Sequence, residues 1–458
     1  MAVKLTRRDL LRQTVFAAGT LVASQLLGAC APPAAKPTEA PKATEAPSGG
    51  AQPAPSGDKL IVWGSDDWSG QADKFEAYKK YVAQCQDKLG FPIEYRVVTW
   101  TEIGDQGPII MSADKYVTDI VVNGTGGTVC QWALQGKLLA LDDLLPADFL
   151  AKINPNVLEN SKYKGKVYAL ECWPSWVIMF YNKELYQKAG LDPEKPPTTI
   201  AELEDHILKL QPVAKTAFMP VWSDWWMGGW FSMVVHALGG KSFEGGSKED
   251  PDTLKFTYDT PECLDAAKWM QRLWKDKMVS QESVNLSQQD VASRFGLGDI
   301  GITANFEAFA ALAEKEGVSK VVGKEGAFVL PGKAAGKGAA ILGDEVQMIP
   351  KTAKHPDWAA KYIQCIHAPE IQKARALSAY INPMFNDLWQ DPDIQKKLFY
   401  WKAILQAGAQ AMPTNFSSKG GEVGSYWTGK LQEIVMQGAD PSATLKDVQK
   451  FAQDKGLG

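Results

Sequence analysis

The densest group of aromatic side chains in the sequence lies near position 225. Trp222, Trp225, Trp226 and Trp230 fall within nine positions, and Asp224 lies among them. Flat indole faces stack on C–H surfaces, and a carboxylate accepts hydrogen bonds from hydroxyl groups. These groups together suit a ligand with C–H faces and a hydroxyl rim, such as a carbohydrate. We predict that Trp222, Asp224, Trp225 and Trp226 contact it; core packing is the alternative for each single indole.

The sequence lacks the short motifs of common catalytic sites. Its four histidines form no His-Glu-x-x-His, and it contains no Gly-x-Ser-x-Gly and no complete phosphate-binding loop. We therefore expect neither catalysis nor a cofactor. A hydrolase that cleaves sugars with two carboxylates stays open as the alternative, because the spacing of such carboxylates is set by the fold.

The cysteines form no metal-binding pattern. They are scattered and include no Cys-x-x-Cys, which makes both a zinc site and a disulfide framework unexpected. We expect no metal, and we expect buried free thiols at the positions other than Cys30, with a single disulfide as the alternative. Those positions are Cys85, Cys130, Cys172, Cys263 and Cys365.

The N-terminus reads as an export signal. Lys4, Arg7, Arg8 and Arg12 precede an uncharged, partly apolar stretch that is too short and too polar for a membrane span. The run from Thr6 to Leu11 resembles a twin-arginine signal, and Leu27-Gly28-Ala29-Cys30 resembles a lipobox. We predict a signal peptide over 1–29 and a lipid on Cys30 that anchors the protein to the outer face of the cytoplasmic membrane.

A tether and a large body follow. Residues 30–58 are rich in Pro, Ala and Thr and, after Cys30, lack aromatic and branched aliphatic side chains, so we predict a disordered spacer. The remaining residues suffice for two lobes, each with its own core. The formal net charge of the whole chain is −4. Because the body is mildly acidic, we expect no nucleic-acid partner.

The body alternates between predicted strands and helices. Strands are expected at 59–63, 91–98 and 119–122, and a helix with one apolar face ends before Gly90. Later helices are expected to begin at Thr199, Thr260-Pro261 and Asp440-Pro441. This order predicts mostly parallel sheets flanked by helices, with ligands at the carboxyl ends of the strands.

An ordered set of short motifs resembles one protein family. The motifs resemble the sugar-binding type of extracellular solute-binding protein, the class that includes maltose-binding protein. Ile200 stands where that class often has tryptophan, and Gly343-Asp344 replaces a commoner glycine pair. The motifs are Tyr168-Ala169-Leu170, Tyr181 to Leu185, Ala189-Gly190-Leu191 and Pro196 to Thr199, with Gly136 to Leu144 upstream and Val346 to Lys351 downstream.

This resemblance implies an α/β fold of the two-lobed periplasmic-binding-protein type (type II). It implies hinge crossings near 172–175, 343–346 and 379–382. We assign 59–172 and 344–380 to lobe 1, and 173–343 and 381–458 to lobe 2. The implied role is a monomeric, extracytoplasmic binding protein that delivers a carbohydrate to the permease subunits of an ABC importer. Closure about the hinges would hold the ligand between the lobes.

The resemblance also supplies candidate ligand residues. These lie in loops after strands, at the lobe crossings and on one late helix. A polyol, a glycerol phosphate and a metal chelate stay open as alternative solutes, although arginine is scarce in these loops. The residues are Asp66, Asp67, Asn123, Trp173, Ser175, Asn305, Glu307, Asp344, Glu345 and Trp427.

Overall fold

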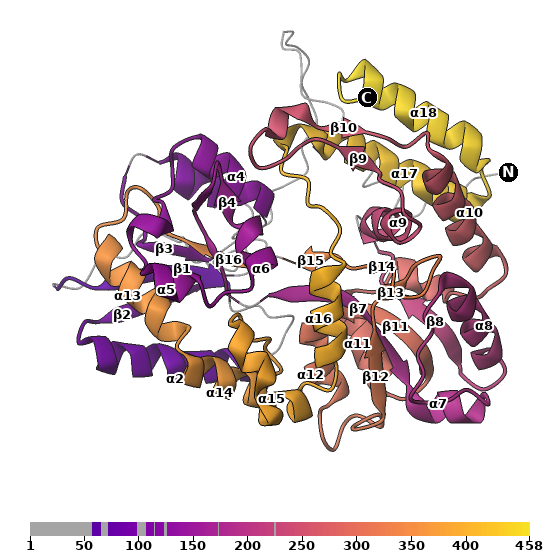
Figure 1. Cartoon of the computed structure of the whole chain (residues 1–458), viewed down its shortest axis with the longest axis horizontal. Coiled ribbons are helices and arrows are strands. Elements are labelled where there is room, and N and C mark those ends of the chain that lie inside the picture. Colours follow the sequence, from indigo (N-terminus) through magenta and orange to yellow (C-terminus); the bar gives the residue numbers. More distant parts are fainter. Residues whose placement is uncertain are drawn as a thin grey trace, which may run out of the picture. The chain divides into compact units, whose positions relative to one another are not determined.

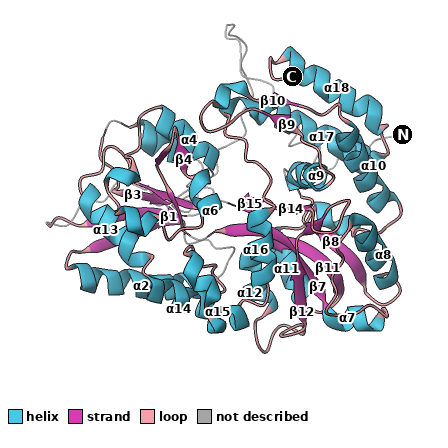
Figure 2. Ribbon diagram, viewed as in Figure 1, coloured by secondary structure: helices cyan, strands magenta, loops and turns pink. Residues whose placement is uncertain are grey.

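The first sheet joins strands from distant parts of the chain (Figures 1 and 2). The computed structural model describes residues 57–65, 72–98, 107–113, 115–122, 126–172, 174–223, 226–343 and 345–458. The strand order is β2-β1-β3-β16-β6. Its members are β1 (Leu60–Ser65), β2 (Ile93–Val98), β3 (Ile120–Val122), β6 (Leu170–Glu171) and β16 (Val346–Met348).

The second sheet is built around one long buried strand. All eight residues of β7 (Ser175–Asn182) are buried, and the strand order is β12-β7-β11-β8, with β15 paired to the start of β7. A strand covered on both faces is expected to read as a continuous apolar run, and β7 does so. The other members are β8 (Thr216–Pro220), β11 (Ile300–Phe306), β12 (Glu325–Phe328) and β15 (Leu342–Gly343).

Both sheets are mixed, which corrects our expectation of mostly parallel sheets. β1 pairs in parallel with β2 and β3, whereas β16 runs antiparallel to β3 and β6. In the second sheet β11 is parallel to β8 but antiparallel to β7. The cause is that the chain crosses from one sheet to the other. β7 begins beside the carboxyl end of β11, and β16 begins beside the carboxyl ends of β3 and β6, so each strand runs antiparallel to those neighbours.

Helices cover the faces of both sheets. α2 (Ala72–Leu89) ends before Gly90, whose φ of +74° fits the predicted left-handed cap. Thr199, Thr260 and Asp440 cap the helices that they were expected to begin. These helices are α8 (Ile200–Leu210), α10 (Pro261–Lys275) and α18 (Pro441–Asp454), and others named below are α4 (Gly126–Leu134), α6 (Pro155–Asn160), α9 (Trp226–Ala237), α13 (Pro356–Ile366), α14 (Pro369–Ala379), α15 (Pro392–Lys397), α16 (Trp401–Ala409) and α17 (Gly421–Gln437).

The core follows the alternation of the strands. In β7, Trp176, Ile178 and Phe180 join one apolar cluster, whereas Val177 and Met179 join another on the opposite face. Gly64 lies inside β1. This position requires glycine, because a Cβ there would come within 2.5 Å of the Tyr95 hydroxyl on β2.

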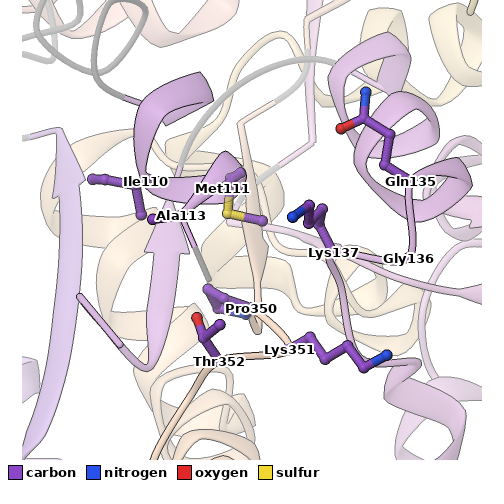
Figure 3. A pocket seen from close by; sticks show the side chains of 9 residues that line it. All are labelled: Ile110, Met111, Ala113, Gln135, Gly136, Lys137, Pro350, Lys351 and Thr352. Carbon is purple, nitrogen blue, oxygen red and sulfur yellow. The ribbon is translucent and has the colours of Figure 1, made fainter. Parts of the chain in front are cut away.

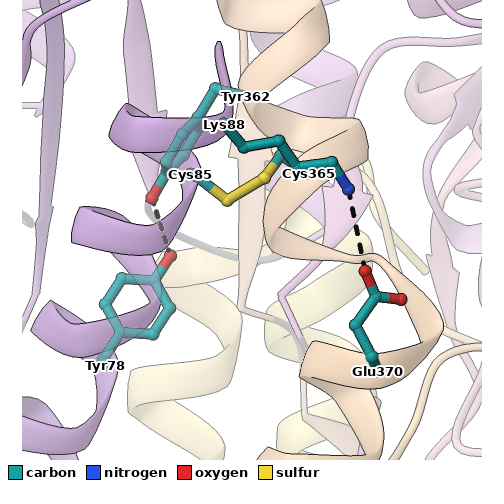
Figure 4. The surroundings of a disulfide bond; sticks show 6 residues. All are labelled: Tyr78, Cys85, Lys88, Tyr362, Cys365 and Glu370. Atoms are coloured by element: carbon teal, nitrogen blue, oxygen red, sulfur yellow. Dashed lines mark hydrogen bonds and ion pairs between the residues drawn. A yellow bond between two sulfur atoms is a disulfide. The ribbon is translucent and has the colours of Figure 1, made fainter. Parts of the chain in front are cut away.

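A disulfide joins Cys85 of α2 to Cys365 of α13, with Cα atoms 5.8 Å apart (Figure 4). Both cysteines are buried, and the bond spans 280 positions of sequence. Loop closure on that scale contributes on the order of 5 kcal/mol to stability in the chain-entropy picture. The alternative of one disulfide is therefore confirmed, and the prediction of free thiols was wrong for these two; Cys130, Cys172 and Cys263 are buried and free, as predicted.

Some contacts bear on where the lobes divide. Residues 384–385 contact the segment just before α6, because Ile153 forms a β-bridge with Phe385 and Asn154 N–H donates to the carbonyl of Met384 at 3.3 Å. Lys373 of α14 pairs with Asp391 at 2.6 Å. The predicted lobe limits remain a prediction, and these contacts favour placing the last limit after α15. Within the described ranges, no helix is long and apolar enough to cross a membrane.

Candidate functional site

Two short passages of chain bring the edges of the two sheets together. β6 ends at Glu171 and β7 begins at Ser175, while β15 ends at Gly343 and β16 begins at Val346. An extended chain spans at most about 3.5 Å per residue, so the joined ends lie within roughly 10 to 14 Å of each other. The two crossings lie at the carboxyl ends of β3, β6 and β11, and ligands bind at the carboxyl ends of strands in sheets of this kind. Two of the predicted crossings are therefore present.

Glu307 fastens the first crossing to the second sheet. Its Oε2 accepts a hydrogen bond from the backbone N–H of Trp176 at 2.7 Å and another from Ser175 Oγ at 3.1 Å. Glu307 is 1% exposed. Two predicted ligand residues, Ser175 and Glu307, are thus brought together and bonded to each other, which fixes the start of β7.

Asn305 supports the same edge. Its side-chain amide donates to the carbonyl of Gln288 at 2.7 Å, and its Oδ1 accepts from the backbone N–H of Phe306 at 2.9 Å. Asn305 is buried. Both ends of this amide are therefore engaged within the second lobe in the present arrangement, so its role here is to shape the edge.

The predicted tryptophans fall into two groups. Trp226 begins α9, is half-buried and meets Phe306 edge-on, with ring centroids 5.2 Å apart. Trp222 has no exposed surface, and Trp427 is 3% exposed with its ring 4.5 Å from that of Phe231. Of these three indoles, only Trp226 can present a face to a ligand without rearrangement of the core.

A buried polar cluster surrounds the second crossing. The carbonyl of Glu345 accepts from Cys172 N–H at 2.6 Å, which ties the two crossings together. Arg375 of α14 is 3% exposed and donates to the carbonyl of Cys172 at 3.4 Å. Burial raises the pKa of the Glu345 carboxyl well above its ordinary value, against the opposing effect of the Arg375 charge. Burial also raises the pKa of the Cys172 thiol.

The third predicted crossing, 379–382, contacts the first. Tyr380 ends α14 in a left-handed conformation with a φ of +56°, and its carbonyl accepts from the Tyr400 hydroxyl at 2.9 Å. Asn382 Nδ2 donates to the carbonyl of Pro174 at 2.9 Å. A non-glycine residue in this conformation costs free energy, so surrounding contacts must hold it. Tyr380 therefore anchors this segment where it passes the crossings.

Several predicted site residues lie outside the part of the chain that the structure describes. Seven are candidate ligand residues and one is the lipidation site. Their predicted roles remain predictions. They are Asp66, Asp67, Asn123, Trp173, Asp224, Trp225, Asp344 and Cys30.

Sequence reasoning missed two charged residues at the crossings. Glu171 is 1% exposed at the end of β6, and Arg375 is buried on α14. A charge inside the apolar run from Tyr168 to Cys172 was a usable signal for Glu171. Arg375 gave no such signal, because a helical arginine is by default a surface residue.

A cavity of about 250 Å³ lies elsewhere in the first lobe (Figure 3). It borders Pro350 and Lys351, beyond the end of β16 that is remote from the crossings. Figure 3 shows Met111 and Lys137 directed toward one another across it. Of the predicted ligand residues that the structure describes, none lines this cavity. Among the described residues no group of acidic, histidine or cysteine side chains could hold a metal ion.

Known proteins resemble this chain over most of its length. The sequence profile of the bacterial extracellular solute-binding protein family matches residues 68–373. A Deinococcus radiodurans protein described as a probable ABC transporter-binding protein is 25% identical over 352 residues, which cover 75% of this chain and 80% of the relative.

Solved structures share the fold. Maltose-bound MalE3 of T. maritima has a TM-score of 0.73 at 19% identity, over 86% of this chain and 99% of that one. An Agrobacterium radiobacter K84 ABC transporter solute-binding protein in complex with ribitol has a TM-score of 0.71 at 18% identity, over 87% and 98% of the respective chains. The predicted two-lobed fold is confirmed.

Proposed function

Because this chain belongs to the bacterial extracellular solute-binding protein family, we propose that it captures a carbohydrate between its two lobes and delivers it to an ABC permease. The family consists of binding proteins that act outside the cytoplasm. The observation that carries the proposal is the meeting of two sheet edges at two short crossings, with the half-buried indole of Trp226 at one of those edges.

The crossings suit a hinge. Continuous chain joins the lobes only over short spans, and a small change in φ and ψ there would rotate one lobe against the other. A ligand that contacts both edges would favour the shut form, because its affinity for that form is greater. The permease would then recognise the shut form.

Residue chemistry favours a carbohydrate over a charged solute. Trp226 is at the edge of the second sheet, and Asp224 and Trp225 directly precede it in sequence. We propose that this segment faces the ligand together with Asp66, Asp67, Asn123, Trp173 and Asp344. A polyol is the second candidate, since a structural neighbour was solved with ribitol and a polyol offers the same hydroxyl rim.

We further propose that the protein is a monomer held at the membrane by a lipid on Cys30, after removal of residues 1–29. The Cys85–Cys365 disulfide supports a location outside the cytoplasm, because such bonds persist in oxidising compartments. The stretch 30–58 would act as a spacer between membrane and body.

A thermal-shift screen against mono- and oligosaccharides and polyols tests the proposal. A solute that binds only the folded protein must raise its melting temperature. For such a solute, Trp226→Ala should weaken binding at least about tenfold, on the scale of a stacked contact. Trp358→Ala is the matched control, because this half-buried indole stacks on Phe91, with ring centroids 4.4 Å apart, in the first lobe's outer helices.

Two outcomes would overturn the proposal. One is the absence of any shift across the screen together with an unchanged small-angle scattering profile. The other is turnover of an oligosaccharide by the purified protein, which would favour the hydrolase alternative. Saturable, stoichiometric binding with a more compact scattering profile is the expected result.

A further inference from the structure

Two loops of the second lobe rest on helices of the first lobe, at contacts that include no crossing residue. One loop, residues 245–250, follows β9 (Phe243–Glu244); the other, residues 413–417, precedes the 3-10 turn Ser418–Gly420. We call this pair of loops the clasp. Phe416 N–H donates to the carbonyl of Gly246 at 3.0 Å, so the two loops hold each other. Figure 1 shows β9 and its partner β10 (Lys255–Phe256) near α17.

Lys248 makes the polar contact of the clasp with the first lobe. Its ammonium donates to the backbone carbonyl of Glu159 at 2.8 Å and forms an ion pair with the Glu159 carboxylate, at the end of α6. The carbonyl of Lys248 accepts from the Cys130 thiol of α4 at 3.6 Å. The Lys248 side chain is 11% exposed, so this lysine is largely covered by the contact.

Phe416 makes the apolar contact. It is 6% exposed and belongs to the apolar cluster of the first sheet, which includes Val129, Cys130 and Trp132. A phenylalanine that is anchored in a loop of one lobe and buried in the cluster of the other would be exposed if the lobes separated. Its burial therefore favours the arrangement in which the lobes touch.

Contacts within the second lobe fix the conformation of the two loops. Gly245 and Gly246 have φ values of +62° and +63°, and a Cβ on Gly245 would come within 2.2 Å of the Thr253 carbonyl oxygen. Asp252 pairs with Lys419 at 2.6 Å, which links the stems of the two loops. The clasp is thus held within the second lobe by its own contacts, and it reaches the first lobe through few side chains.

We propose that the clasp is a releasable latch that biases the lobes toward the closed arrangement without contacting the ligand. Lys248 and Phe416 contact the first lobe away from the crossings, so an opening rotation that carries these loops away from α4 and α6 breaks the Lys248–Glu159 pair and uncovers Phe416. The ligand's apparent affinity depends on the fraction of molecules that is already closed. The clasp therefore sets the affinity of the binding protein from a distance. This inference rests on the proposed function only in that the lobes move.

Small-angle scattering of the purified, ligand-free protein tests the latch directly. Lys248→Glu places two carboxylates together and should raise the radius of gyration, and Glu159→Lys should do the same by opposing two ammonium groups. The double variant, with the charges exchanged, should return the radius of gyration toward that of the wild type. Phe416→Ala should open the protein further than either single charge reversal.

Lys162→Ala is the matched control. Lys162 pairs with the same Glu159 carboxylate at 3.1 Å but from within the first lobe, so its loss should leave the radius of gyration unchanged. Circular dichroism confirms that each variant is folded. Equal radii for the wild type, both charge reversals and Phe416→Ala would overturn the latch. Because no ligand is present, this result is independent of whether the carbohydrate screen succeeds.

Discussion

The crossings and the clasp connect the same two lobes with different kinds of contact. At the crossings the chain is continuous, and the polar groups around it are buried: Glu307 at 1%, Arg375 at 3% and Glu345 at 7% exposure. At the clasp no chain passes between lobes, and the polar contact involves Glu159, whose side chain is 53% exposed.

This difference separates a fixed connection from a reversible one. A buried polar group that loses its hydrogen-bond partner costs about 1 to 3 kcal/mol, so we expect the contacts at the crossings to persist in both the open and the closed arrangement. An ion pair with one exposed partner is worth at most about 1 kcal/mol, because water replaces the lost contact. Stability should therefore depend on the crossings, and the open-to-closed equilibrium on the clasp.

The largest expected effect is the loss of Arg375. Arg375→Met removes the buried guanidinium that donates to the Cys172 carbonyl and lies near Glu345, and should lower the free energy of unfolding by about 1 to 3 kcal/mol because that carbonyl loses its side-chain donor. Urea denaturation measures it. Lys88→Met is the control, since Lys88 pairs with Glu370 at 3.7 Å on the surface and its loss should change stability by less than about 1 kcal/mol. If Arg375→Met lowers the free energy of unfolding no more than Lys88→Met does, the proposed difference between the crossings and the surface contacts is wrong.

A second prediction concerns the pH dependence of stability at His367, a buried residue that ends α13 and contacts Gln347 of β16 through its Nε2. Burial, reinforced by the charge of Arg375, lowers the pKa of His367 to about 3. The unfolded chain takes up this proton below a pKa of about 6.5, so the contribution of His367 to stability is present above that pH and is lost as pH falls toward 3. His367→Gln should flatten this loss by up to about 1.4 kcal/mol per pH unit in that window.

The free energies of unfolding of the wild type and the His367→Gln variant are measured at each pH, and the difference between them is compared. Burial raises the pKa of Glu345, so its contribution has the opposite sign: it is present at low pH and is lost as pH rises through the raised value. Both proteins carry Glu345, and subtraction of their urea-derived stabilities isolates His367. Parallel curves from about pH 6 to pH 4 would show that the imidazole is already protonated in the folded protein.

The smallest effect on stability is expected at the clasp. Lys248→Ala should lower the free energy of unfolding by at most about 1 kcal/mol, because Glu159 remains solvated when its partner is removed. Urea denaturation and small-angle scattering on the same sample measure stability and opening together. A loss of several kcal/mol would mean that Lys248 is a structural residue like Arg375, and the contrast between the two regions would fail.

Sequence predicted the framework well, for identifiable reasons. Helix caps at Thr199, Thr260 and Asp440 are local signals, and the structure begins helices there. The first two crossings followed from the resemblance to the family. The direction of the strands could not be predicted from local sequence. β7 and β16 are antiparallel to their neighbours because the chain has just crossed from the other sheet.

The candidate site was harder to predict. An indole in a tryptophan-rich segment can stack on a ligand or fill a core, and spacing alone did not separate Trp226 from the fully buried Trp222. Pairing of Cys85 with Cys365 depends on helices that are distant in sequence. The clasp was missed because Gly245, Gly246 and Phe416 lie in loops without periodicity.

The chain order of the first sheet has a consequence for how the protein matures. β1, β2 and β3 are synthesised early, but their neighbour β16 begins only at Val346, and Cys85 must wait for Cys365. The strands β7, β8, β11 and β12 all lie between Ser175 and Phe328 and can assemble earlier. We expect the lobe that begins the polypeptide to be the last to acquire its native structure, which leaves the early strands in need of protection while the rest of the chain emerges.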